Sequence, residues 1–518
     1  MKNLSTERRL ITSSVFRFIE KAVVVISSLL LTPFLINTLG QSQYGLWILI
    51  LSILGWFKVI HLGFPSAVQR YITIYLEQKK FKAVNQVFST SLVLFSILGL
   101  IAASLLIMLS QIPEALGTES NNKITLSFAL LIFSLKVFWD LCMGSINGFF
   151  SGLIRFDVDA NLSSLNVIIK SVLIYLLITD LNISGAIIAV LVADITSNVA
   201  KIYYVKKLYP ALAFKFSLVS RAELKKLFSF AKHIIAAGFT KAINTRIDPF
   251  IITKIFDLNA VAFYSVAERL ASHVEQFSLT ISGVFQPVFT KMAANKTNME
   301  SLFLQISYLN LFIASTLYCP LLIFGESFLT LWIGSEFSQA ITLINILVFA
   351  FICSAFSISV IHVLIAQANH KLIAPLSLVA ALANLGLSIL LAHYFGLKGI
   401  ALGTAIGSFL ANVVFCLLML KRYNQFDLKA LIYRFLFCIF TVFVIGLSGQ
   451  HLVKIYLQLS WTSFSLSVLL SFPLTTWIFW MAILPQAMKK QVVEYLRQNM
   501  EKKIGQKFKQ LFKSKNPR

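Results

Sequence analysis

The stretch ISGAIIAVLVADITSNVAKIYYVKKLY, residues 183–209, returns later in the chain as LKGIALGTAIGSFLANVVFCLLMLKRY, residues 397–423. The two copies keep one register for Gly185 and Gly399, Asn198 and Asn412, Lys207 and Lys421, and Tyr209 and Tyr423. Each copy is an apolar run of the length that a membrane-spanning helix needs, roughly 20 residues. The alternative is a chance match between two apolar helices. The shared glycine, asparagine, lysine and tyrosine favour a repeat, and the repeat predicts two halves with the same orientation in a membrane.

The composition places the chain among polytopic membrane proteins. Of its 518 residues 58% are hydrophobic, only 13% are charged, and 46 are phenylalanine. The net charge of +24 lies mainly in short loops and in the C-terminal tail. That distribution suits the anionic cytoplasmic leaflet of a membrane and argues against a nucleic-acid partner.

Apolar runs predict about fourteen membrane-spanning helices. We place them at residues 12–37, 43–65, 84–110, 123–148, 158–180, 183–205, 228–253, 258–288, 302–325, 338–366, 372–395, 398–420, 431–450 and 461–483. Basic residues alternate between the resulting loops. One set of loops carries Arg70, Lys79, Lys80, Lys82, Lys206, Lys207, Lys291, Lys296, Lys421 and Arg422, and the other set holds little beyond Lys123, Lys398 and Lys454. By the positive-inside rule both termini are cytoplasmic.

The repeat divides these helices into an all-α polytopic fold of two pseudo-symmetric six-helix lobes plus two further helices. We predict an N-lobe at residues 1–210, a C-lobe at 211–424 and the extra pair at 425–483. A basic amphipathic tail at 484–518 is expected to lie on the membrane. Ser220 to Glu223 reads as a capping box that starts the seventh span.

Charged residues inside the predicted spans are the main functional signal, because an ionisable side chain in a membrane persists mainly where it meets water, a partner or a ligand. The set is rich in cations, which suits an anionic cargo such as a pyrophosphate. Candidate substrate-binding residues are Arg17, Lys21, Lys58, His61, Lys136, Lys170, Lys241, Arg246 and Arg269. Candidate coupling or charge-pair residues are Glu20, Asp140, Asp194, Asp248, Glu268 and His273.

The alternative is that these side chains only stabilise the fold and bind no ligand. Some lie near the cytoplasmic end and can extend their charges to the interface. Lys136 and Asp140 are four residues apart and can pair within one helix. For the set as a whole we favour a polar cavity between the lobes.

Several short stretches resemble Wzx-type polysaccharide flippases of the multidrug/oligosaccharidyl-lipid/polysaccharide exporter superfamily. They are TLGQSQYGLW at residues 38–47, RIDPF at 246–250, FYSVAERL at 263–270, LWIG at 331–334 and FGLKG at 395–399. The resemblance covers essentially the whole chain. One departure is His61, where relatives often have an acid before Leu-Gly.

The resemblance implies a flippase that moves an undecaprenyl-pyrophosphate-linked oligosaccharide, an O-antigen or capsule repeat unit, from the inner to the outer leaflet of the bacterial cytoplasmic membrane. It also implies partners in the polysaccharide polymerase and chain-length machinery. A drug or small-molecule antiporter of the same fold is the alternative. A membrane polymerase or glycosyltransferase is less favoured, because no long external loop and no acidic catalytic pair is evident.

We therefore expect a transporter rather than an enzyme, with neither catalytic residues nor a metal site. No cofactor is expected, although the few acids leave H+ or Na+ coupling open. Anionic lipids are expected around the basic loops and tail, and the protein is expected to be a monomer.

Overall fold

The computed structural model describes residues 6–116, 122–153, 155–283, 285–367, 373–423, 426, 428–490 and 494. All regular elements in these ranges are helices, which confirms the predicted all-α membrane class. The chain forms two compact units. Unit 1 holds Met1–His273, Phe328–Ala350 and Asn369–Ala411, and unit 2 holds Val274–Ser327, Phe351–Ala368 and Asn412–Arg518. The lobe boundaries expected from the sequence stay a prediction.

Ten helical stretches of the described residues are long and apolar enough to cross a membrane. One of them, Val158–Leu208, contains two of the predicted spans. The ten do not include α2 (Gln41–Glu77), α6 (Arg221–Arg246) or α8 (Leu258–Gly283), although a helix lies at each of those predicted spans. The multi-pass membrane location is thus confirmed, whereas fourteen crossings and cytoplasmic termini stay predictions.

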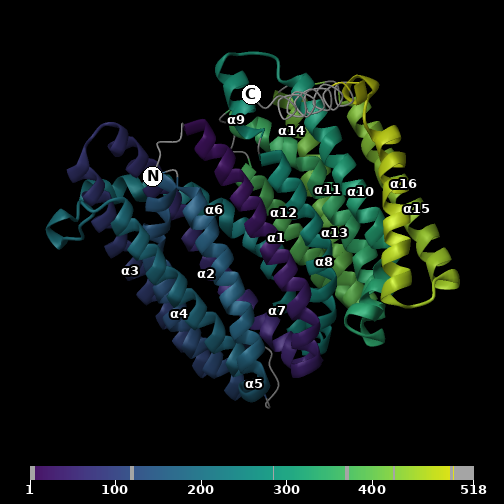
Figure 1. Ribbon diagram of the computed structural model, residues 1–518, viewed down its shortest axis with the longest axis horizontal. Coiled ribbons are helices and arrows are strands. Elements are labelled where there is room, and N and C mark those ends of the chain that lie inside the picture. Colours follow the sequence, from purple (N-terminus) through teal and green to yellow (C-terminus); the bar gives the residue numbers. More distant parts are fainter. Residues whose placement is uncertain are drawn as a thin grey trace, which may run out of the picture. The chain divides into compact units, whose positions relative to one another are not determined.

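The first helices of unit 1 form a bundle. They are α1 (Thr6–Leu39), α2, α3 (Phe81–Gln111), α4 (Lys123–Gly152) and α5 (Phe156–Leu208). Helix α3 packs on α4, α2 packs on both, and α5 packs on α1 and α4. Figure 1 shows α2, α3 and α4 side by side. Their core is aromatic: Phe64 and Phe95 meet edge to face with ring centroids 5.7 Å apart, and Phe149 is fully buried.

Helix α5 is a hairpin of two helical arms. At Asn182 the backbone leaves the helical region, with φ 50° and ψ −139°. Gly396 has nearly the same angles, φ 60° and ψ −140°, between α12 (Ile373–Phe395) and α13 (Leu397–Phe409). Asn182 and Gly396 stand at equivalent places in the two copies of the sequence repeat, so the repeat has a structural counterpart.

A close contact follows the turn in both hairpins. A Cβ atom on Gly185 would lie 2.3 Å from the carbonyl oxygen of Leu177, and one on Gly399 would lie 2.0 Å from that of Leu391. Neither position has room for a side chain. The contact between the two arms therefore explains why both copies of the repeat have a glycine at this position.

The later helices of unit 1 pack against α2. The predicted helix start is confirmed at Ser220, whose hydroxyl accepts from the backbone N–H of Glu223 at 3.5 Å and caps α6. The reciprocal half of the predicted capping box is replaced, because the Ser220 N–H donates to the Thr90 hydroxyl at 3.0 Å. Helix α7 (Asp248–Ile255) follows after Ile247, and Pro249 occupies its first turn, where its missing N–H costs nothing. Along α2, a Cβ atom on Gly55 would lie 2.9 Å from the Arg246 side chain, so α2 and the end of α6 are in close contact.

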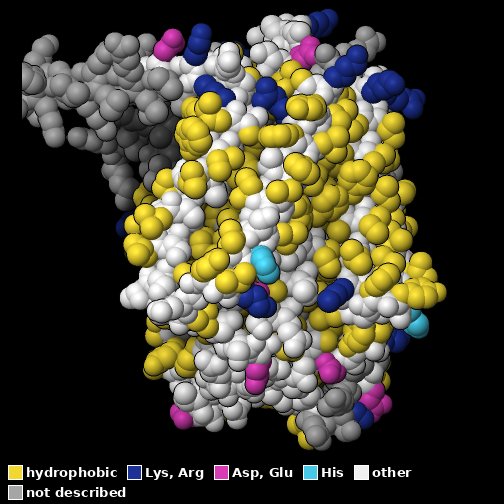
Figure 2. Space-filling model, turned by 90° about the vertical axis from the view of Figure 1, so that its right-hand side faces the viewer, with side chains coloured by type: hydrophobic (Ala, Val, Ile, Leu, Met, Phe, Trp, Pro, Cys, Tyr) yellow, Lys and Arg dark blue, Asp and Glu magenta, His cyan; other side chains and the backbone are white. Residues whose placement is uncertain are grey.

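Unit 2 contains α9 (Gln286–Ala294), a π-helical turn (Leu410–Phe415, of which Asn412–Phe415 belong to unit 2), α14 (Cys416–Tyr423), α15 (Lys429–Tyr456) and α16 (Trp461–Ile483). It also includes most of α10 (Glu300–Trp332) and the end of α11 (Ile341–Ala366). Many large apolar side chains of α15 and α16 are exposed, among them Phe440, Leu469 and Trp477. Figure 2 shows a broad apolar band on this face, with Lys and Arg gathered along one edge. Such a band suits contact with lipid. The predicted amphipathic tail at 484–518 lies almost wholly outside the described residues.

Candidate functional site

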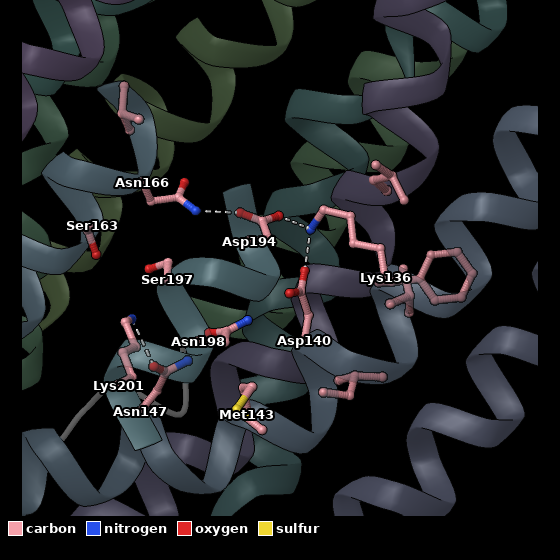
Figure 3. A pocket seen from close by; sticks show the side chains of 15 residues that line it. Lys136, Asp140, Met143, Asn147, Ser163, Asn166, Asp194, Ser197, Asn198 and Lys201 are labelled. Atoms are coloured by element: carbon pink, nitrogen blue, oxygen red, sulfur yellow. Dashed lines mark hydrogen bonds and ion pairs between the residues drawn. The ribbon is translucent and has the colours of Figure 1, made fainter. Parts of the chain in front are cut away.

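An ion cluster in unit 1 joins α4 to the second arm of α5. The Lys136 ammonium donates to Asp140, one turn further along α4, and lies 2.7 Å from Oδ2 of Asp194. The Lys136 side chain is only 8% exposed. Asn166, on the first arm of α5, donates from Nδ2 to Oδ1 of Asp194 at 2.8 Å, as Figure 3 shows. One cation is thus held between two carboxylates, and both arms of α5 are tied to α4.

The cluster lines a cavity of about 390 Å³ between α2, α4 and the two arms of α5. Leu54 and Phe57 of α2 form part of its apolar wall. The other polar side chains around it are Asn147, Ser163, Ser197, Asn198 and Lys201. A cavity with this many hydroxyl and amide groups inside an apolar bundle is suited to hold water or a polar ligand.

A second ion pair stands at the same cavity. Lys201 Nζ lies 2.8 Å from Oδ1 of Asp159 and donates to Oδ1 of Asn147 at 3.0 Å. Lys201 is buried, and its partners come from the first arm of α5 and from α4. The cavity therefore has a paired cation at each of two places, and neither lysine offers a bare charge to a ligand.

Helical spacing explains how these residues converge. Residues 136, 140, 143 and 147 follow one face of α4, since side chains three and four apart share a face. The two arms of α5 contribute residues 163, 166 and 167, and residues 194, 197, 198 and 201. The turn at Asn182 reverses the chain so that these two faces meet.

Two further cations lie near the ion cluster without a carboxylate of their own. Lys170, half-buried on the first arm of α5, interacts electrostatically with Asp194, Lys136 and Arg269. Arg269 of α8 donates from Nη1 to the Thr32 hydroxyl of α1 at 3.2 Å. Among the side chains that the structure describes, neither Lys170 nor Arg269 forms an ion pair with an acid. Because no acid pairs with them there, Lys170 and Arg269 are available to bind an anionic ligand.

Asp248 forms a separate polar contact at the start of α7. Its Oδ2 accepts from the Tyr264 hydroxyl of α8 at 2.7 Å, and the Thr404 hydroxyl of α13 lies 3.4 Å away. The carboxylate is buried and its Oδ1 has no hydrogen-bond partner in the described part of the chain. This acid joins three helices but does not line the cavity of the ion cluster.

The other candidates from the sequence differ in burial or lie outside the described side chains. Lys21 and Arg246 are exposed, whereas Glu20, Glu268 and His273 are half-buried. The side chains of Arg17, Lys58, His61 and Lys241 lie outside the described part of the structure. Three groups of the predicted set can thus be described: the ion cluster, the pair of Lys170 and Arg269, and the contact of Asp248.

Sequence reasoning missed the neutral and paired residues of the cavity. Asn147, Asn166, Ser163 and Ser197 carry no charge, so they do not stand out in an apolar span. Their signal is spacing, because Asn147 follows Lys136 and Asp140 on one face of α4. Among the described residues, no group of His, Cys, Asp and Glu is arranged to hold a metal ion.

Comparison with families and curated proteins points to polysaccharide biosynthesis. Residues 18–293 match a family model described as polysaccharide biosynthesis protein. The chain is 24% identical to the membrane protein EpsK of Bacillus subtilis (strain 168) over 423 residues, which cover 77% of this chain and 80% of EpsK. It is 22% identical over 413 residues to a Shigella flexneri protein named as an O-antigen transporter, covering 77% of this chain and 94% of that protein.

Solved structures share the fold. The lipid II flippase MurJ, in an inward closed conformation, aligns with a TM-score of 0.73 at 17% identity, covering 90% of this chain and 98% of MurJ. An inward-facing multidrug resistance transporter of the MATE family aligns with a TM-score of 0.67 at 16% identity, covering 79% of this chain and 99% of the transporter. At these identities the likeness establishes the fold alone.

Proposed function

Because this chain belongs to the polysaccharide biosynthesis protein family, we propose that it is a flippase for undecaprenyl-pyrophosphate-linked oligosaccharides. The family match makes the chain a polysaccharide biosynthesis protein, and its fold is that of the lipid II flippase MurJ and of the MATE transporters. In the proposed reaction a repeat unit of O-antigen or capsule crosses from the inner to the outer leaflet. No covalent bond is made or broken, so no catalytic residue is needed.

One observation carries the proposal. Lys170 and Arg269 lie within electrostatic range of each other and form no ion pair with an acid in the described part of the chain, although Asp194 attracts Lys170 from further away. Lys136, by contrast, is paired with both Asp140 and Asp194. A pyrophosphate offers several oxygens to which lysine and arginine donate charge-assisted hydrogen bonds. We assign the head group to Lys170 and Arg269, and give Lys136 the role of holding α4 on α5.

The cycle we propose is alternating access, in which the site opens first to the cytoplasm and then to the other side. The polyprenyl chain stays in lipid against the apolar outer surface, while the glycan crosses beside polar groups. A gradient of H+ or Na+ drives the cycle through one of the intramembrane acids.

The test is a glycan assay on single variants. Lys170→Ala and Arg269→Ala each remove a charge-assisted bond worth roughly 1.5–3 kcal/mol, so export should fall about 10- to 100-fold. Surface polysaccharide is measured by blotting at matched protein levels in a strain that lacks the chromosomal copy. Lys454→Ala serves as the control, since Lys454 pairs with Glu326 at an exposed site.

Normal surface glycan in both cavity variants at normal protein levels would refute the assignment of the head group. A multidrug antiporter remains the second candidate, because the MATE transporters share the fold. Deletion that changes drug resistance and leaves surface glycan intact would favour that candidate.

A further inference from the structure

A stripe of polar side chains runs through the interior of unit 2, where the predicted charges are few. Glu275, Ser278 and Ser282 follow one another at spacings of three and four on α8, so they share a face of that helix. Ser278 and Ser282 are buried and Glu275 is half-buried. Gln286 continues the series at the first residue of α9.

Polar side chains of α10 and α11 form hydrogen bonds with this stripe. Glu275 accepts from the Ser354 hydroxyl of α11, and Ser282 donates to the Asn310 side chain of α10. One turn before Asn310 on α10, the hydroxyl of Ser307 lies 2.7 Å from that of Ser359 on α11.

The stripe ends at a histidine. Nδ1 of His362 on α11 is hydrogen-bonded to the Gln286 side chain. From Glu275 to Ser282 the distance along the axis of α8 is roughly 10 Å, at 1.5 Å per residue. That is about a third of the thickness of the hydrocarbon core. The polar contacts therefore reach from the middle of the eighth predicted span to its cytoplasmic end.

Several atoms of the stripe lack hydrogen-bond partners within the described residues. They are Oγ of Ser278, Nδ2 of Asn310 and Nε2 of His362. A buried polar atom without a partner costs about 1–3 kcal/mol, so such atoms are normally satisfied by bound water. The unsatisfied atoms alternate with the direct contacts and leave places for water between them.

We propose that this stripe is a hydrated proton path that connects the cytoplasmic end of unit 2 with Glu275. A proton enters from cytoplasmic water near His362, moves along hydroxyls and bound waters past Ser282 and Ser278, and protonates the Glu275 carboxylate to the neutral acid. The reverse steps return it. The proposal rests on the proposed function only in naming the proton as the ion that drives the cycle.

The groups that face Glu275 suit this role. Tyr318 of α10 interacts electrostatically with it, and the Ser354 hydroxyl of α11 donates to it. On its own helix, His273 and Arg269 precede it by two and six residues. The Ser354 hydroxyl can both donate and accept a hydrogen bond, so it can pass a proton to or from the carboxylate.

The experiment follows proton movement directly. The purified full chain is reconstituted in liposomes of anionic phospholipid that contain a pH-sensitive dye, and a potassium diffusion potential drives proton entry. Wild-type protein should acidify the lumen, and Glu275→Gln should reduce the rate at least tenfold. Glu326→Gln, a change at the exposed pair with Lys454, should leave the rate unchanged.

Ser278→Ala gives the sharper test, because it removes a hydroxyl that has no partner in the described structure. It should slow proton movement several-fold without lowering the melting temperature. Ser145→Ala is the matched control: Ser145 is also buried and its hydroxyl also lacks a partner, but it lies on α4 of unit 1. A purely structural stripe would make the two variants behave alike.

Failure of the path and failure of the proposed function are distinguishable. Wild-type liposomes without proton movement, or Glu275→Gln with a normal rate, would overturn the path even if the glycan assay supports a flippase. Loss of proton movement in Glu275→Gln with normal surface glycan would support the path and refute its role in driving export.

Discussion

The hairpin of α5 and the hairpin of α12 and α13 turn at equivalent residues, Asn182 and Gly396, with nearly the same backbone angles. In α12 and α13 the close approach continues beyond the turn. A Cβ atom on Gly403 would lie 2.5 Å from the backbone nitrogen of Ser388, and one on Gly407 would lie 2.8 Å from Cβ of Asn384. Small residues bring two membrane helices into direct backbone contact in this way.

The α5 hairpin has alanines where α13 has those two glycines, at Ala189 and Ala193. Its arms line a polar cavity instead of closing on each other. Four polar or charged residues of α5 are replaced by neutral residues at the equivalent positions of the second copy. In chain order, Asn166, Lys170, Asp194 and Lys201 become Ala380, Asn384, Ser408 and Phe415. The same helical hairpin thus forms a charged cavity in α5 and a close, neutral helix contact between α12 and α13. The difference teaches that the two copies share the turn, while the charged cavity lies only at the α5 hairpin among the described residues of the two copies.

The largest effect should come from moving the charge to the neutral hairpin. Asn384→Lys places an ammonium where the native side chain is 4% exposed and where Ser408 replaces the acid of α5. The cost of burying an unpaired ion is several kcal/mol, so little folded protein should accumulate. Membrane levels of a fluorescent fusion measure this. The reciprocal Lys170→Asn should accumulate normally, and the opposite order would contradict the comparison.

The next largest effect concerns the ion cluster. Asp194→Ala leaves Lys136 with Asp140 as its remaining carboxylate and leaves Asn166 without its acceptor, which should lower the free energy of unfolding by roughly 1–3 kcal/mol. Ser408→Ala, the equivalent change in the neutral copy, should cost less than about 0.5 kcal/mol. Unfolding in mixed micelles gives both values. Equal losses would show that the two copies do not differ in the way we describe.

A third pair of variants tests what the copies share. Gly185→Ala and Gly399→Ala both push a methyl group onto a carbonyl oxygen of the facing arm. Each should lower stability by about 1–3 kcal/mol, and by similar amounts. Melting temperatures of the detergent-solubilised protein provide the measurement. If only one glycine tolerates alanine, the turn geometry is not common to both hairpins.

The smallest effect is expected at Ser388. Its hydroxyl can donate to Oδ1 of Asn384 at 3.1 Å, one turn earlier on α12, or to the carbonyl oxygen of Ile400 on α13 at 3.3 Å. Hydrogen bonds between membrane helices contribute roughly 0.6 kcal/mol, so Ser388→Ala should shift stability by about that amount. A loss above about 2 kcal/mol, measured by the same unfolding assay, would mean that polar contacts and not small residues hold α12 on α13.

Local features of the chain were predicted correctly from the sequence. The last two spans, expected at 431–450 and 461–483, correspond to Lys429–Tyr456 and Trp461–Ile483, because long apolar runs between polar loops mark helices clearly. The pairing of Lys136 with Asp140 followed from their spacing of four residues. The partner Asp194 lies far away along the chain, and no spacing rule connects it to Lys136.

The sequence by itself determined an all-α membrane protein, the internal repeat, and that charged residues stand within apolar spans, since apolar length, register and residue type are local properties. Only the tertiary structure decided which charges are already neutralised. Lys136 and Lys201 find acids across helices, whereas Lys170 and Arg269 do not. The physical reason is that an ion pair depends on distances between helices, and those follow from a turn at Asn182 and from the size of the side chains between the two arms.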